Sequence, residues 1–238
     1  GKRQPLRIHT SFQFDRDDQP TQRIQQDLMP AAVCMWNQAL FVNSVVGPLR
    51  FDRNCVSHWQ TEGEPCAAFD TAPDQCGDEA MLDVSWMNEL TACAKATTSG
   101  MSECVTKPAG AGIDNIDFVI IVKAADSITC KNSPSTLGYA HACRYDQNDR
   151  PILGFINFCP NAVGDADDGT AISTAAHELG HALGFSASTW PSMRMNDGTT
   201  PRTSRDESGQ PAKGAIKCSN GQNAKDERPA ASSTLKRG

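Results

Sequence analysis

Two histidines and a glutamate within five residues form the strongest chemical signal in the sequence. The stretch TAAHELGHALGFSAST, residues 174–189, contains His177, Glu178 and His181. On a helix, His177 and His181 lie one turn apart on the same face, so both imidazoles can bind one metal ion. Zinc lowers the pKa of bound water to about 7, and Glu178 stands beside the pair to accept its proton. The pattern predicts Zn²⁺ bound by His177 and His181, with Glu178 as the general base and acid of peptide hydrolysis.

A catalytic zinc ion usually has three protein ligands, and the motif supplies two. No histidine follows His181 in the sequence. Glu207, which lies 26 residues beyond His181, is a local alternative because a carboxylate is an acceptable zinc ligand. The third ligand is therefore left open by the residues alone.

Other polar residues are interpreted as structural. Histidine is commonly a partly buried polar residue, and we expect this role for the three that lie outside the motif: His9, His58 and His141. An acidic run precedes the motif: Asp165, Asp167 and Asp168. A twelve-residue calcium loop starting there would need a glutamate at Ala176, so helix capping explains the run better than calcium binding.

The motif needs a helix and neighbouring strands to hold it in place. A helix is predicted over residues 171–183, closed by Gly184, which suits a left-handed C-terminal cap. Gly180 inside that helix costs about 1 kcal/mol relative to Ala, so we expect another element to pack closely there. Four strands are predicted, at residues 6–14, 116–124, 138–143 and 151–158. The second of them, IDFVIIVKA, is a near-continuous apolar run typical of a buried strand.

The remaining chain gives weaker signals. Residues 21–46 show a helical pattern interrupted at Pro30, with four core candidates: Leu28, Val33, Trp36 and Leu40. Residues 48–51 suggest a short strand. Residues 55–104 are irregular and hold five of the ten cysteines, so we expect disulfide-stapled loops around a short helical turn near residues 82–90.

The cysteines indicate an oxidising compartment. All ten are widely spaced between Cys34 and Cys218, without a C-x-x-C pair. An even number at such spacing favours disulfides and an extracellular or cell-surface location. The longest apolar run, residues 118–122, is too short to span a bilayer, so a soluble chain is expected.

The net charge of −6 is unevenly distributed along the chain. Residues 191–238 carry nine Lys or Arg against five Asp or Glu, whereas residues 1–190 carry 13 against 23. The basic end is rich in Ser, Thr, Asn, Gly and Pro and lacks patterned aromatic residues. It is predicted to be a polar, loop-rich region, and nucleic-acid binding finds no support in it.

These segments together resemble one family. HELGHALGFS, the preceding PILGFINFCP and the following MRMNDGTTPRT are similar to the leishmanolysin-like (invadolysin-like) metzincin zinc metalloproteases of cell surfaces. The resemblance extends back through IDFVIIVKA and LMPAAV to LRIHTSF and is weakest over residues 55–100. It implies an N-terminal part of the catalytic domain, with protein or peptide substrates.

The resemblance also implies an α+β metzincin fold. A twisted mixed sheet is expected with a backing helix and an active-site helix, and residues 138–143 are expected to form an antiparallel edge strand that pairs with extended substrate. On this basis residues 1–190 form an N-terminal catalytic subdomain with a Cys-rich insertion at about 55–104. Residues 191–238 begin a polar lower subdomain that is incomplete in this chain.

The resemblance bears on the third zinc ligand as well. Ordinary metzincins would place a histidine at residue 187, where this chain has Ala187. Leishmanolysin-like proteins instead interpose a long insertion before the third histidine. Gly184 and the similarity of the flanking segments argue against Glu207. We therefore expect the ligand to come from polypeptide beyond Gly238, where a membrane anchor could also lie.

Two disulfides follow from the implied sheet. The end of the edge strand at Cys143 should lie near the start of the strand that Cys104 precedes, which predicts Cys104–Cys143. Cys130 and Cys159 both follow parallel adjacent strands, which predicts Cys130–Cys159. The other six cysteines allow fifteen pairings, and a partner for Cys218 outside this chain stays open.

Two functions of different class remain after these steps. The first is a zinc endopeptidase represented by part of its catalytic domain. The second is a non-catalytic cell-surface or adhesion protein that keeps the metzincin fold with an incomplete metal site. Glu178 favours the first, because a scaffold has no need of a carboxylate at that position.

Overall fold

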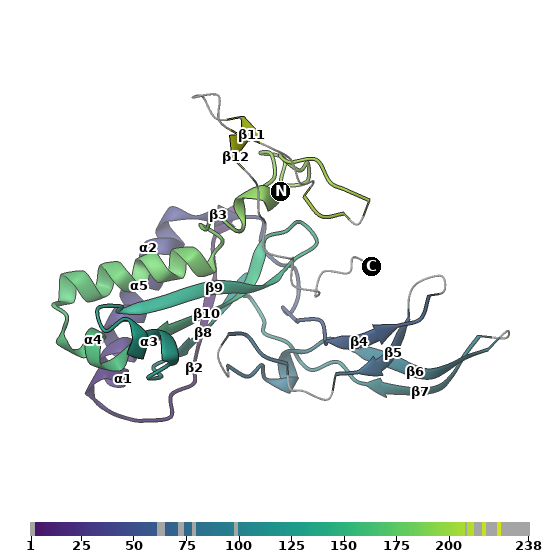
Figure 1. Cartoon of the computed structure of the whole chain (residues 1–238), viewed down its shortest axis with the longest axis horizontal. Coiled ribbons are helices and arrows are strands. Elements are labelled where there is room, and N and C mark those ends of the chain that lie inside the picture. The colour runs from purple at the N-terminus through teal and green to yellow at the C-terminus, as the bar shows by residue number, and fades with distance from the viewer. Residues whose placement is uncertain are drawn as a thin grey trace.

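A four-stranded mixed sheet forms the centre of the chain (Figure 1). The computed structural model describes residues 3–60, 65–70, 74–77, 80–97, 100–207, 209–211, 216–217 and 223–224. The order of the strands is β2 (Ile8–Phe12), β8 (Phe118–Lys123), β10 (Pro151–Phe158) and β9 (Gly138–Tyr145). β2 and β10 pair with β8 in parallel, and β9 pairs with β10 antiparallel at the edge of the sheet. The four predicted strands and the antiparallel edge are confirmed.

The central strand β8 is buried on both faces, as its apolar run predicts. Successive side chains of a strand point to opposite faces. Phe118 and Ile120 accordingly belong to a core cluster with the helices α2 (Met29–Ala39) and α5 (Asp168–Ala182). Val119 and Ile121 belong to a second cluster, formed with the irregular segments around residues 49–87. The sheet is thereby held between the helical layer and these segments.

The N-terminal helical region is shorter than predicted and is interrupted at a different place. It consists of α1 (Gln19–Arg23), the π-helical segment η1 (Ile24–Leu28) and α2. The irregularity precedes Pro30 because proline is tolerated in the first turn of α2, where its missing N–H has no helical partner to lose. The helix ends at Ala39, and Phe41–Val42 form β3, so the predicted extension to residue 46 is wrong.

A second four-stranded sheet extends to one side of the first (Figure 1). Its order is β4 (Cys55–His58), β5 (Cys66–Phe69), β6 (Leu90–Thr97) and β7 (Gly100–Lys107). The predicted loops are therefore wrong for this region, whereas the predicted disulfides and the short helical turn, η2 (Val84–Trp86), are present. The strands escape detection because they contain mainly Ala, Thr, Ser and Cys rather than alternating large apolar residues. The strand predicted at residues 48–51 is reduced to isolated bridges at Leu49 and Phe51.

The described part of the chain contains four disulfides, and one of the two predicted pairs is among them. Cys130–Cys159 is confirmed. Cys104–Cys143 is wrong, because Cys104 lies on β7 directly opposite Cys93 of β6 and bonds to it. Cys143 bonds instead to Cys76. The fourth disulfide is Cys55–Cys66, which links β4 to β5.

Two cysteines remain outside these pairs. Cys34 is exposed on α2 and forms no disulfide within the described part of the chain. Cys218 lies outside the described residues, and the question of its partner stays open with it.

The other elements are short. They are β1 (Gln4–Pro5), α3 (Ile128–Asn132), α4 (Pro160–Asp165), η3 (Trp190–Ser192), β11 (Ile216–Lys217) and β12 (Asn223–Ala224). α3 and α4 were not predicted. The parts of residues 191–238 that the structure describes contain no longer element, and the boundary near residue 190 stays a prediction. Within the described residues, no helix is both long and apolar enough to cross a membrane.

Candidate active site

The helix α5 that carries the motif is capped at both ends. Its N-cap is Asp167, whose carboxylate accepts a hydrogen bond from the backbone N–H of Thr170 at 2.9 Å. This confirms the capping role predicted for Asp167. At the other end Gly184 has a φ of 96°, and the N–H of Phe185 donates to the Gly180 carbonyl at 3.0 Å. With the bond from the N–H of Gly184 to the His181 carbonyl at 3.1 Å, this is the Schellman motif that glycine permits.

The two histidines meet on one face of α5. The distance between Nε2 of His177 and Nε2 of His181 is 2.9 Å. Nδ1 of His181 lies 2.8 Å from the carbonyl oxygen of Phe185. A carbonyl oxygen can only accept, so Nδ1 carries the proton of the neutral ring and Nε2 keeps its lone pair. That lone pair points toward His177.

Glu178 lies beside the histidine pair and is buried, with 9% of its surface exposed. Its neighbour is the start of the edge strand β9, since a Cβ atom on Gly138 would lie 3.6 Å from Cγ of Glu178. Burial raises the pKa of Glu178 above its ordinary value, while the nearby His177 and His181 act in the opposite direction. A carboxyl with a raised pKa is suited to proton transfer near neutral pH.

The histidine geometry fits a zinc ion as far as these two donors go. Zinc–nitrogen bonds of about 2.0–2.1 Å allow one ion to be shared by two nitrogens that are 2.9 Å apart. The Phe185 carbonyl supplies the partner that zinc-binding histidines normally have on their second nitrogen. Among the described residues, no group of three or more His, Cys, Asp or Glu side chains is placed to hold a metal. Glu207 is described, is exposed and belongs to no such group.

The other histidines lie apart from the pair. His9 on β2 contacts the ring of Trp86, and His141 on β9 contacts the ring of Phe155. His58 lies on β4 in the second sheet. Their structural roles stay predictions.

Two aromatic residues, Trp36 and Phe185, lie next to the motif. A Cβ atom on Gly180 would lie only 2.8 Å from Cζ2 of Trp36 on α2, which confirms the close packing expected at Gly180. The indole Nε1–H of Trp36 donates to the Ala176 carbonyl at 2.8 Å. The rings of Trp36 and Phe185 are stacked with centroids 5.1 Å apart. From the sequence, Trp36 is predicted only to be a core residue, and no pattern singles out Phe185.

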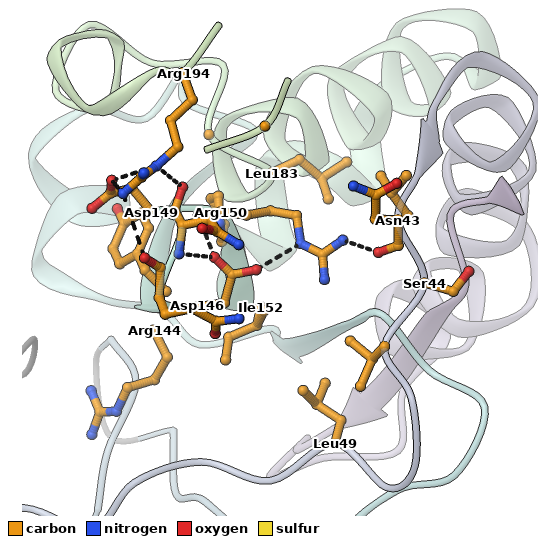
Figure 2. Close-up of a pocket in the computed structure, with 18 of the residues that line it drawn as sticks. Asn43, Ser44, Leu49, Arg144, Asp146, Asp149, Arg150, Ile152, Leu183 and Arg194 are labelled. Atoms are coloured by element: carbon orange, nitrogen blue, oxygen red, sulfur yellow. Dashed lines mark hydrogen bonds and ion pairs between the residues drawn. The ribbon is translucent and has the colours of Figure 1, made fainter. Parts of the chain in front are cut away.

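A cavity of about 930 Å³ adjoins the C-terminal end of α5 at Leu183 (Figure 2). None of the three motif residues lines it. Its arginines are engaged by neighbours: Arg150 pairs with Asp146 at 3.3 Å and donates to the Asn43 carbonyl at 2.8 Å. We therefore assign the Arg150 charge to holding the β9–β10 turn against the segment after β3, and not to the chemistry of the motif.

Comparison with known proteins covers both the sheet and the motif. The sequence model of the leishmanolysin peptidase family matches residues 85–212. The chain is 34% identical to the leishmanolysin-like peptidase of Caenorhabditis elegans over 221 residues, which is 87% of this chain and 32% of the relative. It is 33% identical to that of Drosophila melanogaster over 214 residues, covering 85% of this chain and 30% of the relative.

A shorter similarity links the chain to the ciliated left-right organizer metallopeptidase of Mus musculus. The two are 36% identical over 117 residues, which is 44% of this chain and 17% of the mouse protein. The chain thus spans about a third of the length of the leishmanolysin-like relatives. The family match includes the edge strand β9, the strand β10 and the whole of α5 with its histidine pair. The chain belongs to the leishmanolysin family of metallopeptidases.

Proposed function

We propose that this chain supplies the active-site helix of a zinc-dependent endopeptidase. The observation that carries the proposal is the meeting of three groups on α5. The Nε2 atoms of His177 and His181 are 2.9 Å apart. The buried Glu178 lies next to them in the sequence and packs close to Gly138 at the start of β9. Membership of a peptidase family supports peptide bonds as the substrate.

Each residue has a distinct role in the proposed reaction. His177 and His181 hold Zn²⁺ through Nε2, the nitrogen that the Phe185 carbonyl leaves unprotonated in His181. A bound zinc ion supplies Lewis acidity, which polarises a carbonyl and brings the pKa of water close to 7. The Glu178 carboxylate accepts the proton of the attacking water and delivers it to the nitrogen of the leaving amine.

The edge strand β9 is the proposed docking place for the peptide. β9 pairs with β10 on one side and ends the sheet on the other. An extended peptide added to this edge would be bound by main-chain hydrogen bonds, which tolerate many side chains. Since Gly138 of β9 adjoins Glu178, such a peptide would pass close to the general base.

The third zinc ligand is proposed to be a histidine outside these 238 residues. Residues 182–238 contain no histidine. The leishmanolysin-like relatives are about three times as long as the matched region, so polypeptide is available to supply one. The four disulfides are consistent with the secretory pathway, and we place the protein outside the cell or on its surface.

The general base is tested by Glu178→Gln in the full-length protein. The amide keeps the size of the side chain but cannot accept the proton, so kcat should fall by about 10²–10⁴-fold while the zinc content stays unchanged. Glu207→Gln is the matched control, because Glu207 is exposed and belongs to no group of described side chains placed to hold a metal. It should leave both kcat and zinc content as in the parent.

Three outcomes would change the proposal. Equal peptidase rates in Glu178→Gln and the parent would remove Glu178 from the reaction. Loss of zinc in Glu207→Gln would identify Glu207 as the third ligand. A full-length parent without chelator-sensitive peptidase activity would favour the non-catalytic surface protein.

A further inference from the structure

We propose that Trp36 is a positioning residue for His181, acting through Phe185. The Trp36 side chain comes from α2, far from the motif in sequence, and contacts both the helix and the turn that follows it. The consequence for metal binding rests on the proposed function.

The first contact anchors the indole to α5. Nε1–H of Trp36 donates to the carbonyl of Ala176 at 2.8 Å. Ala176 and Gly180 lie one turn apart on the same face of the helix. Because Gly180 has no side chain, the indole ring enters the space where a Cβ would lie 2.8 Å from Cζ2. The position of the ring relative to α5 is thereby set by a hydrogen bond and by a gap shaped to receive it.

The second contact extends this anchoring to the turn after α5. The Phe185 ring stacks on the Trp36 ring with centroids 5.1 Å apart and an interplanar angle of 28°. Phe185 is 46% exposed, and the stack with Trp36 covers part of its ring. Together with the Schellman hydrogen bonds of the backbone, the stack determines where the Phe185 peptide group lies.

The third contact passes from Phe185 to the motif. The Phe185 carbonyl oxygen accepts from Nδ1 of His181 at 2.8 Å. This bond selects the tautomer in which Nε2 has a lone pair, and it orients the ring so that Nε2 lies 2.9 Å from Nε2 of His177. A shift of the Phe185 carbonyl would release the ring and allow the other tautomer, in which Nε2 is protonated and cannot bind a metal.

A purely structural role for Trp36 makes a different prediction. Trp36 packs against the same core cluster as Val33, its half-buried neighbour on α2. If Trp36 only filled the core, its loss would resemble the loss of Val33 and would lower stability without changing His181. The tautomer of His181 therefore distinguishes the two roles.

The test is nitrogen-15 NMR of histidine side chains in the metal-free chain at a pH where the imidazoles are neutral. The chain has only five histidines, which makes assignment by substitution practical. In the parent, His181 should show a protonated Nδ1 and an unprotonated Nε2. Trp36→Leu should give a mixture of tautomers, whereas Trp36→Phe, which keeps an aromatic ring beside Phe185, should largely restore the parent pattern.

Two further variants keep the test decisive. Phe185→Ala removes the stack from the exposed side, so it threatens folding least and should give the same mixture as Trp36→Leu. Val33→Ala should lower stability and leave the tautomer unchanged. An unaltered His181 tautomer in folded Phe185→Ala or Trp36→Leu would overturn the inference, as would an equal shift in Val33→Ala.

Zinc titration of the same substitutions in the full-length protein separates this inference from the proposed function. Loss of a partner that orients a metal-binding histidine typically weakens metal affinity 10–100-fold, and we expect this for Trp36→Leu and Phe185→Ala. If the full-length parent binds no zinc while the tautomers shift as described, the proposed function fails and the positioning role of Trp36 stands. If the parent binds zinc and the tautomers do not shift, only the positioning role fails.

Discussion

The ion pair between Arg7 and Asp117 gives the clearest quantitative prediction about stability. Asp117 is buried, directly precedes β8 and accepts four hydrogen bonds. Three come from Arg7: from Nε at 2.8 Å, from Nη2 at 2.9 Å and from the backbone N–H at 3.1 Å. The fourth comes from the backbone N–H of Val45 at 2.7 Å. One carboxylate thus joins the segment before β2, the segment after β3 and the start of β8.

The expected cost of Asp117→Asn follows from these contacts. Each carboxylate oxygen faces two donors, so an amide NH₂ in either position opposes two donors and loses two bonds. Breaking a buried ion pair by changing one partner typically costs 3–5 kcal/mol. The Arg7 side chain is 32% exposed, and water can solvate part of its charge, which reduces the estimate to about 3 kcal/mol. Urea denaturation at pH 7 measures this difference.

The same pair predicts how stability depends on pH. Burial alone would raise the pKa of Asp117, but the hydrogen bonds from Arg7 and Val45 outweigh it and hold the pKa below the ordinary value. A carboxyl whose pKa is lowered by folding stabilises the protein above its unfolded pKa of about 4, and this contribution is lost as the pH falls through the folded pKa. The difference in unfolding free energy between the parent and Asp117→Asn should therefore become smaller below about pH 4.

Asp114→Asn is the matched control for this prediction. Asp114 is exposed three residues before Asp117, so its substitution should change stability by less than about 0.5 kcal/mol. If Asp117→Asn is no more destabilising than Asp114→Asn at pH 7, the four bonds carry no net stability. If the difference in unfolding free energy between the parent and Asp117→Asn stays constant from pH 7 to pH 3, the reasoning about the carboxylate is refuted.

Two other perturbations test the packing and the disulfides. Gly180→Ala gains about 1 kcal/mol of helix propensity, but its Cβ would lie 2.8 Å from Trp36, and overpacking typically costs 1–3 kcal/mol. We expect a net loss of about 1 kcal/mol by urea denaturation, and a more stable variant would show that the contact is loose. Replacing Cys130 and Cys159 by serine opens a loop with a sequence separation of 29 and should cost about 3–4 kcal/mol. A loss of stability no larger than that of two serine substitutions at exposed positions would contradict the loop-closure argument.

The features predicted correctly from sequence are those in which local pattern and structure coincide. Residues 118–122 are continuously apolar, and a strand buried on both faces needs that pattern. The spacing of His177 and His181 places both rings on one helical face wherever the helix lies. Gly184 has the backbone freedom that the observed φ of 96° requires. None of these inferences needs knowledge of distant contacts.

The features that were missed depend on pairing between distant or weakly patterned segments. The predicted Cys104–Cys143 pair is wrong because it rests on the strand order of the central sheet, whereas Cys104 belongs to a hairpin of another sheet. That hairpin has no run of large apolar residues to reveal it. The Trp36–Phe185 stack joins residues almost 150 positions apart in the sequence. The sequence gives one indication of it, which is the glycine at position 180 inside a helix, where another element is expected to pack closely.

The end of α5 shows why the motif and its glycine act as one unit. A helix that continued past Leu183 would keep the Phe185 carbonyl along the helix axis, out of reach of the side chain one turn earlier. The left-handed Gly184 reverses the chain, and the same reversal brings the Phe185 carbonyl to Nδ1 of His181. It also turns the Phe185 ring toward Trp36. The glycine that ends the helix therefore also creates the hydrogen bond that leaves Nε2 of His181 unprotonated, as the proposed metal site requires, and the two requirements explain its place three residues after the histidine.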